Sequence, residues 1–343
     1  MTQPLGTQLA AYIARRLPEA RDVTVSALAR IPGGASRETY RFRLSYRTAD
    51  GETVELPLIL RRDPPSSLID TQRRIEFAAY AAFHGSAVPV PRMLWLEEDE
   101  SHLGHPFFVA EEIAGFEASP MALLTEPYLA SHPALAIRKW TILGEIAKAD
   151  PDRLDLMGAF EPVAADAAWK RELDYWEGVI NADEMAPQPI IRAAIRWLRA
   201  NPPPPAQKVG VVHGDYRTGN FLYDAKGGIH GILDWEMAHL GDPLEDLAWS
   251  LNPIWRWAKD ERCGGLAPRG EAIAIWERAS GLTADPPALH WWELFNCVKG
   301  QGIWVSSAKA WSDGENRDPI LVYSAWLMGN AQDRAALSLM GRL

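Results

Sequence analysis

The 343-residue sequence has little of several features that would place a protein in a class at once. It holds only two cysteines, Cys263 and Cys297, which form neither a CxxC pair nor a disulfide framework, so a reducing compartment is expected rather than secretion. No apolar run approaches the roughly 18 residues of a membrane-spanning helix, and residues 1–20 contain no continuous apolar segment. We therefore expect a cytoplasmic protein with no membrane association.

An excess of positive charge is also lacking. The net charge is −10 at pH 7, and the isoelectric point is about 5.4. Because phosphate backbones are gripped by clustered Lys and Arg, this balance argues against a nucleic-acid partner. An acidic field instead tolerates or attracts cationic ligands and metal ions. With 47% hydrophobic residues and 15 tryptophans the chain can fill a sizeable core, and we expect a globular protein.

The first third of the chain alternates between the periodicities of strands and helices. Leu9, Ile13 and Leu17 have helical spacing, whereas residues 40–47 alternate apolar and polar side chains, as a half-buried strand does. Up to about Ile113 the predicted order is a helix, two strands, a helix and two strands. The segments after the first helix are residues 40–47, 53–62, 71–83, 88–99 and 105–113.

The rest of the chain has mostly helical spacing. The predicted helices cover residues 134–149, 168–182, 189–200, 287–310 and 319–339. These patterns predict an α+β fold with a small mixed lobe, residues 1–113, and a larger, mostly helical lobe, residues 114–343. A cleft between two lobes is where a ligand is expected.

The main exception to the helical pattern is the stretch VVHGDYRTGNFLYDAKGGIHGILDWE, residues 211–236, which predicts a polar loop followed by a hairpin. Asn220 lies just before one strand and Asp234 at the far end of its partner, so both side chains should meet at one edge, with Asp215 on the adjoining loop. Oxygen ligands of this kind suit Mg²⁺. A carboxylate not bound to the metal could accept the proton of an attacking hydroxyl, which is the division of labour that phosphoryl transfer needs.

Asp215 and Asn220 are five residues apart, as are the catalytic Asp and metal-binding Asn of protein kinases. Together with HGDYRTGN, the later motifs ILDWE and GDPLEDLAW give the sequence a resemblance to the aminoglycoside phosphotransferase and choline kinase group, relatives of the protein kinases, from about Ile31 to about Leu339. The resemblance implies a bilobal kinase-like fold, with Asp215 as catalytic base and Asn220 and Asp234 as Mg²⁺ ligands.

The residues around these three are interpreted either from the family resemblance or from local sequence signals. The resemblance implies that His213 braces the loop and that Asp246 hydrogen-bonds the loop from behind. Asp242, Pro243 and Glu245 form a complete helix-start signal, so capping explains Asp242.

The small lobe is expected to hold ATP. A glycine-rich turn lets backbone N–H groups approach phosphate oxygens. Where kinases carry a strand lysine paired with a helix glutamate, this sequence has Arg61, with Arg62 beside it, and Glu76. Arginine here is familiar in the branch of the family that resembles the kinase-like domains fused to acyl-CoA dehydrogenases. The predicted nucleotide contacts are Gly33, Gly34, Ala35, Ser36, Arg61 and Glu76, with backbone groups near Glu111 and Ile113 meeting adenine.

The acceptor is expected to be a small molecule with a hydroxyl group. Tryptophans at helical spacing in the last third of the chain favour a core role, although some could line the acceptor pocket. An aminoglycoside would need acidic groups in the cleft, and the candidates are Glu236, Glu245, Asp260, Glu261, Glu293 and Asp313. A hydroxyacyl-CoA-type acceptor, which the resemblance favours, would need a basic and apolar entrance, and the candidates are Arg256, Lys259, Arg262, Lys299 and Lys309.

Two rival functions remain. A metal-dependent phosphoesterase would use clustered His, Asp and Asn, but His230 and His239 show no obvious ligand spacing. A catalytically weak nucleotide-binding scaffold is suggested by Arg61 in place of lysine. The predicted function is an ATP- and Mg²⁺-dependent phosphotransferase that acts on the hydroxyl of a small molecule.

Overall fold

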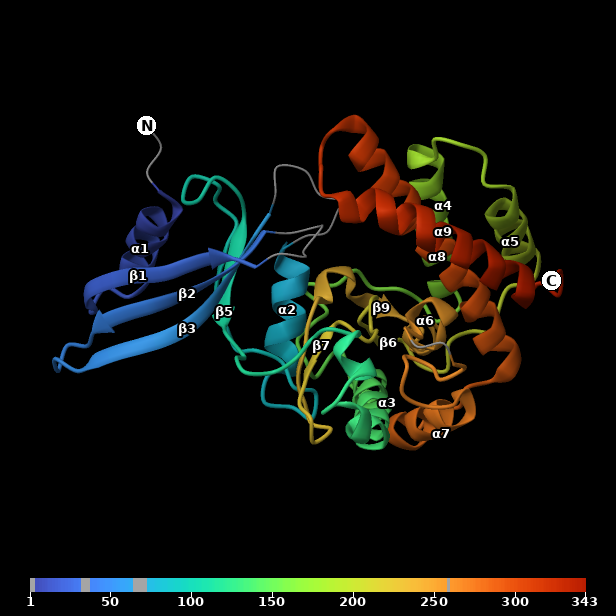
Figure 1. The fold of residues 1–343 in the computed structure, drawn as a ribbon, viewed down its shortest axis with the longest axis horizontal. Helices are drawn as coiled ribbons and strands as arrows, with labels where there is room; N and C mark the ends of the chain where they lie inside the picture. The colour runs from blue at the N-terminus through green and yellow to red at the C-terminus, as the bar shows by residue number, and fades with distance from the viewer. Residues whose placement is uncertain (1–3, 32–37, 64–72, 258–259) are drawn as a thin grey trace. The chain divides into compact units, whose positions relative to one another are not determined.

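The computed structural model describes residues 4–31, 38–63, 73–257 and 260–343 (Figure 1). The predicted glycine-rich turn, residues 33–36, and Lys259 fall outside these ranges. The chain divides into two compact units. Unit 1 consists of Met1–Ala81 and Pro91–Ala114, and unit 2 consists of Ala82–Val90 and Gly115–Leu343.

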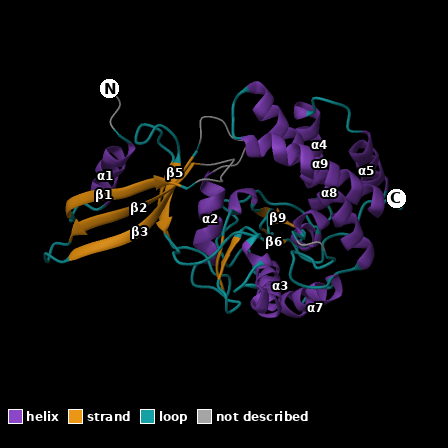
Figure 2. Ribbon diagram, viewed as in Figure 1, coloured by secondary structure: helices purple, strands orange, loops and turns teal. Residues whose placement is uncertain are grey.

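Unit 1 is built on a five-stranded antiparallel sheet with the strand order β1-β2-β3-β5-β4 (Figure 2). The sheet is accompanied by two helices, the second of which ends in unit 2. In chain order the elements are α1 (Leu5–Arg16), β1 (Arg21–Arg30), β2 (Glu38–Arg47), β3 (Thr53–Arg62), α2 (Arg73–Phe83), β4 (Met93–Glu97) and β5 (Phe107–Glu111).

The alternation of β2 creates the core of unit 1. Phe42 and Leu44 are buried, and Phe42 is paired in register with Leu58 of β3. Leu9 and Ile13 of α1 belong to the same cluster, so the helical face and the strand face bury each other's apolar side chains. The predicted helix, strands and second helix of this unit are therefore confirmed.

The first strand, β1, was missed by the sequence prediction. Most of its side chains are exposed, and two register shifts interrupt its pairing with β2. Asp22 and Ala27 have positive φ values of 56° and 52°. Because β1 lies at the edge of the sheet and is bulged, it lacks the regular apolar alternation that identifies a strand in a sequence.

Unit 2 is largely helical, as predicted, with two short antiparallel strand pairs, β6–β9 and β7–β8. The strands are β6 (Gly210–Val212), β7 (Phe221–Tyr223), β8 (Ile229–Ile232) and β9 (His239–Gly241). The α-helices are α3 (His132–Lys148), α4 (Ala168–Asp183), α5 (Pro189–Ala200), α6 (Leu244–Leu251), α7 (Arg269–Ser280), α8 (Pro286–Asp313) and α9 (Pro319–Leu339).

The long helix α8 runs through the core of unit 2 and packs against α4, α5, α6 and α9. Its side chains are buried on several sides, including Trp291, Trp292 and Phe295. Trp249 of α6 and Trp276 of α7 are also at most 1% exposed, so the core interpretation holds for these tryptophans. Among the helices in the described ranges, none combines the length and the apolar character that crossing a bilayer requires.

The two strand pairs fix the ends of the loop that carries Asp215. β6 leads into the loop, and β7 leaves it and pairs with β8, with Phe221 opposite Ile232. The segment Ala82–Val90 supports this hairpin, since Ile232 N donates to Pro89 O at 2.7 Å. The Phe83 ring also stacks on Trp235, with ring centroids 4.9 Å apart.

Candidate functional site

Asp215 lies in the loop after β6, where three side chains hold its carboxylate. Asn220 Nδ2 donates to Oδ2 at 2.7 Å, and Trp249 Nε1 donates to Oδ1 at 2.7 Å. Arg217 Nε is 3.1 Å from Oδ1 and 3.2 Å from Oδ2. The Asp215 side chain keeps an exposed fraction of 15%, so it is held in one orientation while part of it remains open to solvent.

Burial and charge act on Asp215 in opposite directions. Burial raises the pKa of the Asp215 carboxyl, and the Arg217 guanidinium lowers it. The charge of Asp234 raises that pKa, while the hydrogen bonds from Trp249 and Asn220 lower it. The net shift is upward, which favours a carboxylate that can take up a proton.

Asn220 and Asp234 lie at the same edge of the β7–β8 hairpin, where Leu233 N donates to Asn220 O at 2.8 Å. Asn220 Nδ2 also donates to Asp215 O at 2.9 Å. Because both of its hydrogen bonds to Asp215 use Nδ2, the amide oxygen Oδ1 is the atom left to bind a cation. Asp234 has left-handed φ and ψ values of 69° and 52°, a conformation in which Asp is enriched among non-glycine residues.

His213 braces this arrangement from inside the protein. Its Nδ1 accepts a hydrogen bond from Asp215 N at 3.1 Å, and its Nε2 lies 2.9 Å from Leu233 O. These partners place the ring proton on Nε2. Burial lowers the pKa of His213 to about 4, so the imidazole is neutral at pH 7 and links the loop to the end of the hairpin.

Asp246 of α6 holds the loop through two backbone amides. His213 N donates to Oδ2 at 2.6 Å, and Gly214 N donates to Oδ1 at 2.9 Å. Burial raises the pKa of Asp246 to about 6, even though these amides oppose the shift. Gly214 has φ +85°, and an added Cβ would lie 2.4 Å from Met237 O, so only glycine fits here.

Asp242 lies two residues before the start of α6, where Pro243 has the N-cap position, and its Oδ1 accepts from Leu244 N, the first amide of the helix, at 3.0 Å. The other oxygen, Oδ2, accepts from Trp292 Nε1 at 3.0 Å. Glu245, the other polar residue of the helix-start signal, turns inward instead and ion-pairs with Lys299.

The structure contradicts the predicted roles of Lys299 and Glu245 on an acceptor surface. They were assigned to rival acceptor surfaces, one basic and one acidic, but their side chains are only 1% and 0% exposed and form an ion pair of 2.8 Å. Lys299 Nζ also donates to Gly214 O at 2.6 Å. The sequence could not reveal this, because the charge of a residue on a helix does not show which face of the helix is buried.

Arg217 and Trp249 were not assigned to the site from the sequence, although both bind the Asp215 carboxylate. The Arg217 guanidinium carbon also lies 4.7 Å from the centre of the Trp255 ring. Trp249 has helical spacing and is 1% exposed, so its periodicity indicated only a core residue. The signal available was chemical: a buried indole N–H requires an acceptor.

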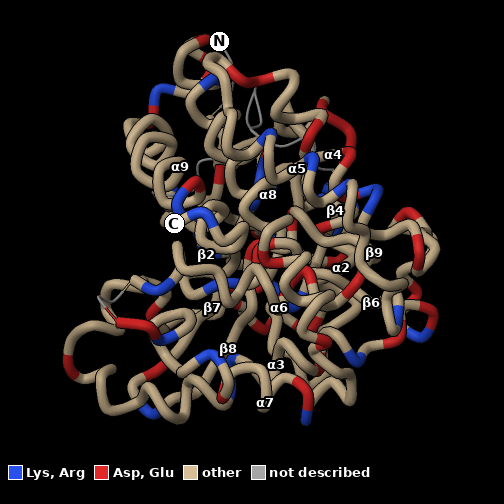
Figure 3. Tube along the Cα trace, turned by 90° about the vertical axis from the view of Figure 1, so that its right-hand side faces the viewer, with Lys and Arg blue, Asp and Glu red and all other residues tan. Residues whose placement is uncertain are grey.

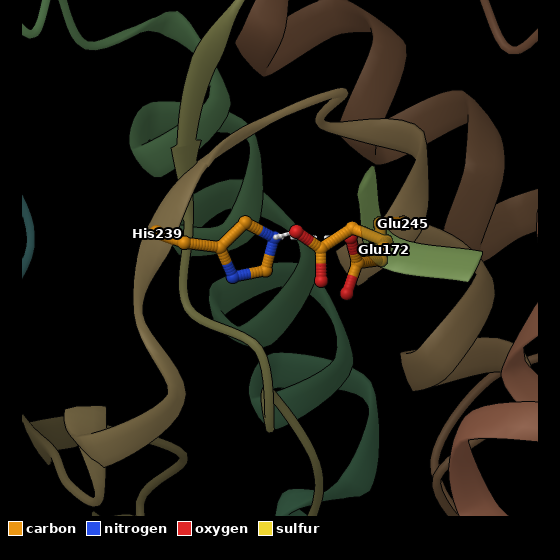
Figure 4. Close-up of side chains that lie close together, drawn as sticks. All are labelled: Glu172, His239 and Glu245. Carbon is orange, nitrogen blue, oxygen red and sulfur yellow. Dashed lines mark hydrogen bonds and ion pairs between the residues drawn. The ribbon is translucent and has the colours of Figure 1, made fainter. Parts of the chain in front are cut away.

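A second group of polar side chains lies behind the loop. Figure 4 shows His239 of β9 facing the carboxylates of Glu172 and Glu245. His239 Nε2 is 3.1 Å from Glu245 and 3.6 Å from Glu172. Burial lowers the pKa of His239, but Glu172 and Glu245 outweigh it and raise the pKa to about 9. The ligand atoms of these three residues lie within 4.8 Å of one another, but the group includes none of Asp215, Asn220 and Asp234, so it adds no ligand to the site that the motif predicts.

His230, the other histidine near the motif, also has a local explanation. Its Nε2 is 2.7 Å from Asp224 Oδ2, and its ring stacks on Phe116 with centroids 3.8 Å apart. It therefore braces the hairpin turn.

In unit 1 the structure pairs Arg61 with Glu76. Arg61 is 3.1 Å from Glu76, whose side chain is 1% exposed and also binds Arg73. Arg62 is engaged elsewhere, with Glu38 Oε2 at 2.9 Å from its Nε and Leu103 O at 2.9 Å from its Nη1. Of the two arginines, Arg61 makes the ion pair with the helix glutamate.

The two residues predicted near adenine lie at and beyond the end of β5. Glu111 N already donates to Arg92 O at 2.9 Å, and Ile113 is half-buried two residues further on. Adenine contact by the Glu111 amide would therefore require that hydrogen bond to be replaced.

Most of the remaining charged residues that were candidates for an acceptor surface take part in ion pairs. Asp260 pairs with Arg262, and Glu261 pairs with Arg256. Two further pairs complete the set: Glu293 with Arg269, and Asp313 with Lys309. Glu236 is buried. Figure 3 shows acidic and basic residues interspersed along the chain, so neither a purely acidic nor a purely basic entrance can be drawn from these candidates.

Solved structures share this fold. A putative aminoglycoside phosphotransferase from Ralstonia eutropha is similar with a TM-score of 0.73 and 18% identity, over 98% of each chain. A complex of aminoglycoside phosphotransferase APH(4)-Ia with AMP-PNP and hygromycin B gives a TM-score of 0.60 and 17% identity, over 97% of this chain and 98% of that one. The antiparallel sheet followed by a largely helical part is therefore the kinase-like fold of the aminoglycoside phosphotransferases.

Sequence relatives point to the branch that Arg61 suggested. Acyl-CoA dehydrogenase family member 11 of Homo sapiens is 26% identical over 90% of this chain and 37% of its own length. Member 10 of Mus musculus is 30% identical over 63% of this chain and 19% of its own length. The chain thus spans little more than a third of the length of acyl-CoA dehydrogenase family member 11. The model of the phosphotransferase enzyme family matches residues 27–292, most of the chain, and the protein therefore belongs to the phosphotransferase enzyme family.

Proposed function

We propose that the protein transfers the γ-phosphoryl group of ATP, with Mg²⁺, to a hydroxyl group of a small molecule. The observation that carries the proposal is the junction of Asp215, Asn220 and the hairpin end at Asp234. A carboxylate kept partly exposed lies directly beside an amide whose oxygen is available and near a second carboxylate. Transfer of a phosphoryl group requires mainly positioning and charge neutralisation, which such a junction supplies.

Asp215 is the proposed catalytic base. Its raised pKa and its remaining exposure suit uptake of the acceptor's hydroxyl proton. Arg217 and Trp249 hold the carboxylate so that one lone pair can face that hydroxyl. The acceptor oxygen would then already be aligned for attack on the γ-phosphorus when the bond between that phosphorus and ADP breaks.

The donor set at the hairpin fits Mg²⁺. Asn220 Oδ1 and the Asp234 carboxylate are hard oxygen ligands, and Mg²⁺ is commonly held by one or two protein oxygens together with phosphate oxygens and water. The bound ion would neutralise charge on the transferred phosphoryl group. Asn220 is oriented for this by its two hydrogen bonds to Asp215.

Unit 1 is proposed to hold the nucleotide. The Arg61–Glu76 ion pair supports a phosphate-binding arginine, because guanidinium groups bind phosphate oxygens in a bidentate way. Gly33, Gly34, Ala35 and Ser36 would contact phosphates, and the chain near Glu111 and Ile113 would contact adenine. The nucleotide complexes of structural neighbours, with AMP-PNP and with GDP, agree with this proposal.

For the acceptor we propose a hydroxyacyl-type molecule rather than an aminoglycoside. The sequence relatives named as acyl-CoA dehydrogenases favour it. The candidate charges do not decide between the two classes, because the ion pairs in the described ranges involve the basic candidates Arg256, Arg262, Lys299 and Lys309 as well as the acidic ones.

The test is a thermal-shift titration with ATP in the presence and absence of Mg²⁺. A ligand that binds only the folded state raises the melting temperature. The rise grows with the ratio of the ligand concentration to its Kd. A Mg²⁺-dependent rise, followed by phosphate transfer in a screen of hydroxyacyl-CoA and aminoglycoside acceptors, would support the proposal. A rise without turnover would favour the nucleotide-binding scaffold, and no rise at millimolar ATP would reject nucleotide binding.

A further inference from the structure

The peptide groups on either side of the Gly214 Cα are held by opposite charges. Asp246 Oδ1 accepts from Gly214 N at 2.9 Å, and Lys299 Nζ donates to Gly214 O at 2.6 Å. Gly214 O belongs to the peptide group that continues into Asp215. Because charged groups make stronger hydrogen bonds than neutral ones, these two contacts fix the orientation of the backbone that enters Asp215.

Lys299 reaches Asp215 by a second route, through Trp249. The Lys299 ammonium is 5.3 Å from the centre of the Trp249 ring. The indole N–H of that ring donates to Asp215 Oδ1 at 2.7 Å. A cation near the ring face draws electron density from the indole, so the N–H becomes a stronger donor.

Lys299 is itself held by the residues around it. Its ammonium pairs with Glu245 Oε1 at 2.8 Å, and Glu245 Oε2 contacts His239 at 3.1 Å. Asn296 Nδ2, one turn before Lys299 on α8, donates to Glu245 O at 2.9 Å. The contacts connect α8, α6 and β9 behind the loop, and the Lys299 side chain is 1% exposed. A compact ammonium suits this place, because it serves two acceptors lying in different directions.

We propose that Lys299 is a positioning residue for Asp215, acting through the carbonyl of Gly214 and through the indole of Trp249. The inference rests on the proposed function, in which Asp215 is the base. A buried ion pair by itself is weak evidence for a contribution to stability. The two contacts from Lys299 toward Asp215 give the ammonium a role beyond neutralising Glu245.

The main test replaces the ion pair by apolar side chains of similar length, in the double variant Lys299→Met/Glu245→Met. Removing both charges avoids leaving one of them buried without a partner. We expect kcat to fall by about 10- to 100-fold, because small displacements of a catalytic group are costly, while KM for ATP changes by less than about twofold. An unchanged kcat in the folded variant would overturn the proposal.

Lys170→Met is the matched control. Lys170 makes an ion pair with Asp174 one turn away on α4, and its side chain is 60% exposed. The same substitution should leave kcat and KM unchanged. An equal loss of kcat in both variants would show that the effect is not specific to Lys299, and would also overturn the proposal.

Trp249→Phe tests the second route, since it keeps an aromatic ring but removes the N–H that binds Asp215. If Lys299 acts partly through this indole, the loss of kcat on combining Trp249→Phe with the double variant should be smaller than the product of the separate losses. Fully multiplicative losses would exclude the route through Trp249 and leave only the contact with Gly214.

Hydrogen–deuterium exchange gives a readout that does not depend on activity. Amides of residues 211–223 should exchange faster in Lys299→Met/Glu245→Met, whereas those of α3 should keep the wild-type rate. Unchanged exchange in the loop would contradict the proposal even if the wild-type protein transferred no phosphate. Absence of transfer by the wild type, with faster exchange in the variant, would instead reject the proposed function and keep the structural role of Lys299.

Discussion

Asp215 is surrounded by three donors that act on it in different ways. Asn220, itself a proposed metal ligand, donates an amide N–H, Arg217 supplies an opposite charge, and Trp249 supplies a neutral N–H from the core. Together these contacts fix the orientation of the carboxylate. Burial nevertheless raises its pKa. Each donor can be removed separately, so the site can be tested one contact at a time.

Asp215→Asn should lower kcat by at least about 100-fold, because an amide cannot accept the hydroxyl proton and general-base catalysis contributes about 10²–10⁴-fold. Nucleotide binding should survive, since the proposed contacts with ATP lie on other residues. Steady-state kinetics and the ATP-induced thermal shift measure the two effects separately. Turnover close to that of the wild type would remove Asp215 from the role of base.

His239 should make stability depend on pH. Its folded-state pKa of about 9 lies above the ordinary value of 6.5, so the stabilisation is fully present below about pH 6.5 and is lost as pH rises through 9. The loss should be on the order of 3 kcal/mol in the free energy of unfolding, measured by urea titration at several pH values. His239→Gln should abolish this dependence, and the exposed His84→Gln should keep it.

At the scale of elements, the packing between helices α3 and α7 predicts how a substitution at their contact changes stability. A Cβ added to Gly144 of α3 would lie 2.4 Å from Ala279 Cβ and 3.0 Å from Trp276 O of α7. Gly144→Ala should therefore destabilise the protein by about 1–3 kcal/mol, through overpacking. Gly178→Ala is the control, because nothing lies within 4 Å of its added Cβ on α4. Here alanine's higher helix propensity should raise stability by up to about 1 kcal/mol. Chemical denaturation distinguishes the two signs.

Elements with strong periodicity could be predicted from the sequence. The elements that were missed lack such periodicity. Strand β2 alternates regularly and was found, whereas the bulged edge strand β1 was not. Helix α7 was missed as well. Its apolar residues form one continuous run, residues 272–276, instead of recurring at helical spacing, so they give a weak helical signal.

The same limit applies to the candidate site. The loop and hairpin could be predicted, because turn residues and short apolar runs mark them locally in the sequence. Lys299 is 84 residues beyond Asp215, and Trp249 is on a different helix from Lys299. Their contacts depend on how α6 and α8 pack, which spacing along the chain does not encode.

At the scale of the whole molecule, the two units are proposed to divide the work between nucleotide binding and transfer. Arg61→Ala in unit 1 should raise KM for ATP by about tenfold, the loss expected for one charge-assisted hydrogen bond, with a smaller effect on kcat. Arg62→Ala, which removes the contacts with Glu38 and Leu103, is the control. Initial-rate measurements over a range of ATP concentrations decide between them. A larger rise in KM for the control would move the phosphate contact to Arg62.

The segment Ala82–Val90 has a practical consequence for dissecting this protein. It belongs to unit 2 although it is encoded within unit 1, so the backbone passes between the units three times. A fragment starting at Gly115 would lack Phe83 and Pro89, and with them the cover over Trp235 and the hydrogen bond to Ile232. Unit 2 is thus not a detachable module of contiguous sequence. A split-protein design would need to start the second fragment at Ala82, which carries residues 91–114 of unit 1 along with it.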